Sequence, residues 1–97
     1  MEKWGFIYTS GDGDGSPVHV TAGSHACTLL TVGVPSTDVD PEVVEALIGE
    51  GVELIELCGA FGPDSAAAII DVVDGRVPVG YVTYPASEAG GLHELFG

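Results

Sequence analysis

Glu56 and Cys58 combine residue types and a spacing that favour chemistry. They alternate with apolar residues, and in a β-strand both side chains would lie on the same face, about 6.5–7 Å apart. A carboxylate in an otherwise apolar strand is costly to bury unless it is paired, hydrogen-bonded or protonated, so Glu56 is a candidate general acid or base. Cys58 comes just before an expected helix start, where the helix dipole stabilises a thiolate. It is therefore a candidate second acid–base group or nucleophile.

The residues after Cys58 form a candidate ligand-binding loop. A glycine-rich turn from a parallel strand into a helix lies at the sheet edge where ligands collect, and its backbone N–H groups can bind an anion or a developing oxyanion. A tyrosine at the end of the last expected strand would add a hydroxyl beside this loop. The candidate ligand-binding residues are Gly59, Ala60, Phe61, Gly62, Ser65 and Tyr84.

The same residues also have a purely structural interpretation. In it the glycines only form the turn, and Cys58 is a small hydrophobic residue of the core. Glu56 then hydrogen-bonds to neighbouring backbone groups or to a tyrosine. The sequence leaves both interpretations open.

Metal, nucleotide and serine-hydrolase motifs find little support in the sequence. His19, His25 and Cys27 match no established zinc spacing. The acidic stretch 12–16 has neither the third ligand nor the distal glutamate of a calcium loop. The glycines complete neither a phosphate loop nor a dinucleotide fingerprint, and there is no Gly-x-Ser-x-Gly stretch. We therefore expect no metal and no cofactor.

The elements that must position Glu56 and Cys58 alternate between strand and helix. Asp40 followed by Pro41 is typical of a helix start. The carboxylate can cap the free N–H groups of the first turn, and proline is tolerated there because the N–H that it lacks would have no partner within the helix. The order strand, helix, strand, helix, strand predicts an α/β fold: a small, mostly parallel sheet of about four strands with two crossover helices. The predicted strands are 4–9, 27–34, 53–58 and 77–84, with a further short strand at 18–21, and the predicted helices are 41–49 and 63–75.

The chain of 97 residues is predicted to form a single domain. Its core spans residues 1–85, and residues 86–97 form a flexible or dimer-contacting tail in which residues 92–96 make a final helical turn. A sheet of so few strands has a poorly covered edge, and a second subunit often covers such an edge. We therefore expect a homodimer.

The charge balance restricts the class of partner. Fifteen Asp and Glu residues stand against Lys3 and Arg76, which gives a formal net charge of −13. Nucleic acids and anionic lipids are bound through Lys and Arg, so neither is expected as a partner. The acidity serves either as a solvated surface or as an adaptation to high salt. The sequence has no long apolar segment or signal-peptide pattern and its two cysteines form no disulfide framework, so a cytoplasmic location is expected.

Three stretches resemble one known family. They are Thr31-Val32-Gly33-Val34-Pro35-Ser36, the run from Glu50 to Pro63, and Val77-Pro78-Val79-Gly80. Together they are similar to the small prokaryotic proteins called domain of unknown function 6506, over about residues 4–85. The Glu-Leu-Cys-Gly-x-Phe-Gly stretch at 56–62 is the most specific part, although the family commonly has glycine where this chain has Ala60. The resemblance implies a compact α/β domain and supplies no reaction.

These observations favour a small cofactor-independent enzyme. Its substrate would be a small molecule bound at the carboxyl end of the sheet, where Glu56 and Cys58 would carry out the acid–base chemistry of an isomerase, a lyase or a cyclase. The alternative is a non-catalytic module that binds a small molecule or acts through its dimer face.

Overall fold

The computed structural model describes residues 1–22 and 26–97. Its strands are β1 (Lys3–Thr9), β2 (Pro17–Ala22), β3 (Cys27–Val34), β4 (Ile55–Leu57) and β5 (Val79–Tyr81). Its helices are α1 (Pro41–Gly49), α2 (Pro63–Val73), a single 3₁₀ turn η1 (Ala86–Glu88) and α3 (Ala89–Phe96).

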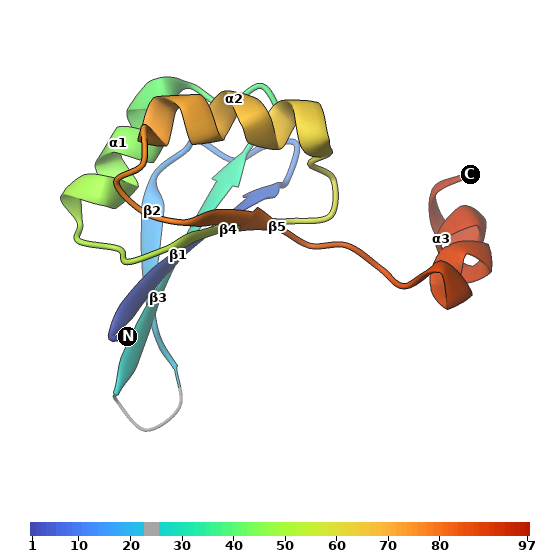
Figure 1. The fold of residues 1–97 in the computed structure, drawn as a ribbon, viewed down its shortest axis with the longest axis horizontal. Helices are drawn as coiled ribbons and strands as arrows, with labels where there is room; N and C mark the ends of the chain where they lie inside the picture. The colour runs from blue at the N-terminus through green and yellow to red at the C-terminus, as the bar shows by residue number, and fades with distance from the viewer. Residues whose placement is uncertain (23–25) are drawn as a thin grey trace.

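The strands form one sheet in the order β2-β3-β1-β4-β5, with β1 at its centre (Figure 1). The pairs β1–β3, β1–β4 and β4–β5 are parallel, and β2 is antiparallel to β3. The predicted α/β class with a mostly parallel sheet is thus confirmed. The sheet has five strands rather than about four, because the weak run near residue 18 pairs with β3 along its whole length.

Helices α1 and α2 cover one face of the sheet (Figure 1). Asp40 caps α1 as predicted: its carboxylate accepts a hydrogen bond from the Glu42 N–H at 3.0 Å, and Pro41 follows. Alternate residues of the central strands pack beneath the helices, as the two-residue period requires. The fully buried core includes Ile7, Leu30, Val32, Ile55 and Leu57 from the strands and Val44, Leu47 and Val73 from the helices.

Both basic side chains of the chain are held by the fold. Arg76 makes two hydrogen bonds to the Glu45 carboxylate, at 2.9 and 2.6 Å, and donates to the carbonyls of Val72 and Val73. It therefore ties the end of α2 to α1, and the guanidinium lowers the pKa of Glu45 below its usual value. The Lys3 ammonium donates to the Glu50 carbonyl at 2.9 Å.

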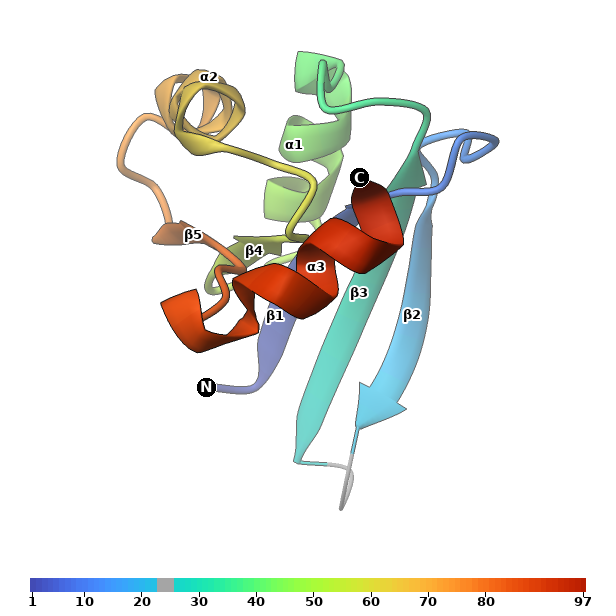
Figure 2. The ribbon, with the colours of Figure 1, turned by 90° about the vertical axis from the view of Figure 1, so that its right-hand side faces the viewer.

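No helix formed by the described residues covers the other face of the sheet (Figures 1 and 2). We call it the open face; it bears the strand side chains that alternate with the core. Trp4 and Phe6 pack edge to face at its centre, with ring centroids 6.4 Å apart. The strand residues of the open face are Trp4, Phe6, Tyr8, Val18, Val20, Leu29, Thr31, Gly33, Glu56 and Gly80.

The C-terminal helix stands away from the rest of the molecule (Figures 1 and 2). A helical turn was expected at 92–96, but α3 begins earlier, at Ala89, and so includes Gly90 and Gly91. None of its residues is buried. Leu95 and Phe96 are 76% and 83% exposed.

Candidate functional site

Glu56 is the middle residue of β4 and lies on the open face. In the sheet register it stands between Phe6 of β1 and Gly80 of β5. It is half-buried, while its neighbours Ile55 and Leu57 point into the core. The prediction that Glu56 lies in a strand is therefore confirmed. Because alternate residues of this strand are buried, the Glu56 side chain lies on the open face.

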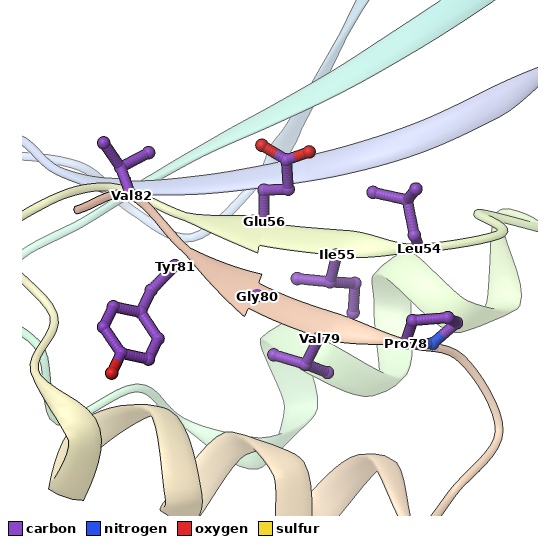
Figure 3. Close-up of a pocket in the computed structure, with 8 residues that line it drawn as sticks. All are labelled: Leu54, Ile55, Glu56, Pro78, Val79, Gly80, Tyr81 and Val82. Atoms are coloured by element: carbon purple, nitrogen blue, oxygen red, sulfur yellow. The ribbon is translucent and has the colours of Figure 1, made fainter. Parts of the chain in front are cut away.

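Gly80 forms the floor of a hollow beside this carboxylate. The hollow is about 410 Å³ in volume and lies across β4 and β5 (Figure 3). Leu54, Glu56 and Val82 project on one side of the two strands, and Ile55, Val79 and Tyr81 project on the helical side. Because Gly80 has no side chain, the space above it on the Glu56 side is empty; a Cβ added there would meet no atom within 4 Å.

Glu56 is isolated among apolar groups. Of the fifteen acidic residues in the chain, it is the one that lies in a strand. Among the described residues no hydrogen bond to its carboxylate is found, and no buried polar side-chain atom lacks a partner. A carboxylate in this position is free to accept a hydrogen bond or a proton from a bound molecule.

Cys58 follows β4 directly, and its N–H donates to the Ile7 carbonyl at 3.0 Å. Its side chain is half-buried and packs against the hydrophobic core. It does not line the hollow that Glu56 and Gly80 share. Glu56 therefore lines the hollow, whereas Cys58 lies outside it.

The predicted ligand-binding loop is divided between core and surface. The Phe61 ring is 2% exposed and belongs to the core, which leaves it no surface for a ligand. Gly62 precedes α2 and caps it through backbone only, with Ser65 half-buried in the first turn. Ala60 is exposed. Gly59 and Tyr84 do come together: a Cβ on Gly59 would lie 3.9 Å from Tyr84 Cε2.

The residues that sequence reasoning missed are those that line the hollow with Glu56, next to it along the chain and across on β5 and its flanks. Leu54, Pro78, Gly80 and Val82 line the hollow with it, and none was a candidate site residue. A glycine inside a strand often marks a place where another group approaches closely, and Gly80 carried that signal. The signal could not be connected to Glu56 without the order of the strands.

A second hollow, of about 330 Å³, lies where β3 meets the start of α1. Asp14, Asp38 and Asp40 line it. Two of these carboxylates already accept hydrogen bonds from nearby backbone N–H groups. Asp40 caps α1, and Asp14 accepts a hydrogen bond from the Ser16 N–H at 2.9 Å, which lowers the pKa of Asp14. Across residues 1–22 and 26–97 no group of three or more His, Cys, Asp or Glu side chains is arranged to hold a metal ion. His25 lies outside the described residues.

The comparisons with known proteins place the chain in one family. The protein-family model described as "Family of unknown function (DUF6506)" matches residues 2–97, which confirms the resemblance drawn from the sequence. Searches of curated proteins and of solved structures each found no match. Within the part of the chain that the structure describes, no helix has the length and apolarity to cross a membrane.

Proposed function

Because the chain belongs to the DUF6506 family, whose function is unknown, we propose an activity from the site itself: a cofactor-independent enzyme that moves a proton on a small molecule through Glu56. One observation carries the proposal. The chain places one of its fifteen acids in the sheet, and does so beside a hollow floored by glycine. A solvated acidic surface would explain the other acids but does not require one beside Phe6 and Leu54.

The charges around the hollow define the class of substrate. Lys3 bonds to the Glu50 carbonyl and Arg76 to Glu45, so neither is available to pair with an anion at Glu56. The hollow is lined mostly by apolar side chains and is at the small end of ligand pockets. The substrate is therefore a small neutral or cationic molecule with an apolar part over Gly80 and an acidic C–H, N–H or O–H group at Glu56.

The proposed chemistry is a reversible proton transfer. The Glu56 carboxylate takes a proton from the substrate and becomes a carboxylic acid, and the same proton returns to another atom or leaves with the product. This sequence suits an isomerase, a lyase or a cyclase.

A binding module is the second candidate, and one observation favours it. Tyr81 is the other titratable residue that lines the hollow, but its side chain points to the opposite side of the sheet from Glu56 (Figure 3). Within a single chain, Glu56 thus has no second proton-transfer group in the hollow. A lone carboxylate can bind a ligand without a second proton-transfer group.

Solvent deuterium exchange separates the two candidates. A panel of small neutral and cationic carbonyl compounds and amines is incubated with the protein in D₂O, while binding is followed by thermal shift. The enzyme is supported if a compound gains deuterium at carbon with the native chain but not with Glu56→Gln. The control is Glu42→Gln, an exposed acid of α1 that should leave the exchange unchanged. Binding that depends on Glu56 without exchange would establish the binding module instead.

A further inference from the structure

The molecule exposes more surface than a compact chain of its size. Its accessible area is 5895 Å², whereas a folded monomer of 9.9 kDa exposes about 5,200 Å². Its radius of gyration is 13.9 Å, against about 12.5 Å for a compact domain of 97 residues. The excess of roughly 700 Å² is close to the area of about 800 Å² that each partner contributes to a stable protein interface.

Two apolar surfaces are exposed on this molecule. The first is the outer half of the open face, where Val18 and Val20 are 58% and 43% exposed beside the half-buried Leu29. The second is one side of α3. Leu92, Leu95 and Phe96 follow the i, i+3, i+4 spacing that places them on a single face of a helix.

The two surfaces do not meet within one chain. After Tyr81 the chain continues through an extended segment that ends at Pro85, and it carries α3 beyond the carboxyl ends of β4 and β5 (Figure 1). The helix packs on η1, and none of its residues is buried by the sheet. An amphipathic helix of eight residues is too short to be stable in water without a partner surface.

We propose that two copies of this chain form a dimer in which the α3 helix of each packs on the outer half of the open face of the other, over Val18 and Val20. A two-fold arrangement makes both contacts identical and covers both of these apolar surfaces in each copy. The inference concerns this surface alone and does not depend on proton transfer by Glu56.

The test is the state of association of the full-length chain, measured by analytical ultracentrifugation over a range of concentrations. Glutamine substitutions keep the net charge at −13, so electrostatic repulsion between copies stays the same. We expect Leu95→Gln/Phe96→Gln, on α3, and Val18→Gln/Val20→Gln, on the open face, each to weaken the dimer at least about a hundredfold. Both pairs are exposed in the single chain, so folding should survive, as circular dichroism will show.

A matched control and a mixture make the test specific. Ile70 is a 48% exposed apolar residue on α2, and Ile70→Gln should leave the dimer constant unchanged. A mixture of the α3 variant with the open-face variant retains one intact contact of the two, so it should dimerise more strongly than either variant alone. The emission of Trp4, the single tryptophan, should shift to the red as the native dimer dissociates on dilution.

Three results would overturn the proposal. The first is a native chain that stays monomeric at all concentrations, whether α3 then folds back on its own sheet or stays exposed. The second is an open-face variant that dimerises as strongly as the native chain, which would indicate a helix–helix dimer. The third is a mixture that dimerises no better than its components.

Discussion

Glu56 and Gly80 are direct neighbours across the β4–β5 pairing. Glu56 provides a carboxylate, and Gly80, which has no side chain, leaves space beside it. Neither residue makes a site without the other. A larger residue at position 80 would fill the space beside the carboxylate, and a neutral residue at position 56 would leave an apolar hollow with no polar group to orient a ligand.

This pairing predicts that Gly80→Leu abolishes ligand binding without unfolding the protein. Nothing lies within 4 Å of a Cβ at Gly80, and its backbone does not need a positive φ, so the side chain is accommodated. We expect a change in unfolding free energy of less than about 1 kcal/mol. Thermal unfolding measures it, and the thermal shift with the best compound of the panel measures binding. Gly49→Ala, at the end of α1, is the control for an added side chain away from the hollow. Binding that survives Gly80→Leu would remove the hollow from the proposed site.

Gly13→Ala should be strongly destabilising, because the loop before β2 lies against β3. A Cβ on Gly13 would be 2.1 Å from the Gly33 carbonyl oxygen, so the backbone must move. The neighbouring Gly15 N–H bonds to that same oxygen at 3.0 Å and would be displaced with it. We expect a loss of about 2–4 kcal/mol in urea unfolding. The control, Gly59→Ala, meets its nearest atom at 3.8 Å and should lose much less.

Glu53 should contribute stability that disappears in acid. Its carboxylate accepts hydrogen bonds from the backbone N–H groups of Glu2 and Lys3, at 2.6 and 3.1 Å, and these bonds lower its pKa below the usual value. In a group with a lowered folded-state pKa, the stabilisation is present above the unfolded pKa and is lost as the pH falls through the folded one. Glu53→Gln should therefore lower the melting temperature at pH 7, and the difference from the native chain should shrink below about pH 4. A difference that stays constant from pH 7 to pH 3 would contradict this role; Glu42→Gln is the comparison.

Salt should stabilise the fold. The net charge of −13 is opposed by few attractive pairs, of which the Arg76–Glu45 bridge is the clearest. Raising KCl from 0.1 to 1 M shortens the Debye length from about 10 to about 3 Å, which weakens the repulsion between carboxylates more than the close contact of one bridge. The melting temperature should rise over this series, and sorbitol at equal osmolality should reproduce little of the rise. No rise would leave the acid excess as a solvated surface only.

Local signals allowed much of the fold to be predicted. Asp40-Pro41 marked the start of α1, and the apolar run at 27–34 marked β3 within its observed bounds. The start of α3 was missed because Gly90 and Gly91 have low helix propensity. Strands β4 and β5 were predicted too long, since each is limited by the three residue pairs that it makes with the other.

The candidate site was predicted only in part, for a different reason. The alternation of residues 55–57 was enough to single out Glu56. Gly80 is twenty-four positions away in the sequence, and it becomes a neighbour only through the pairing of β4 with β5. Such a relationship depends on the order of the strands, which no local pattern encodes.

The central position of β1 has a consequence for biosynthesis. This strand precedes both of its partners in the chain: Lys3 pairs opposite Thr28, and Gly5 opposite Ile55. The nascent chain must therefore leave the β4 edge of an aromatic strand unpaired until Ile55 has been made, and closing the sheet is a late and non-local event. Chaperones that bind exposed apolar segments would meet this protein at β1.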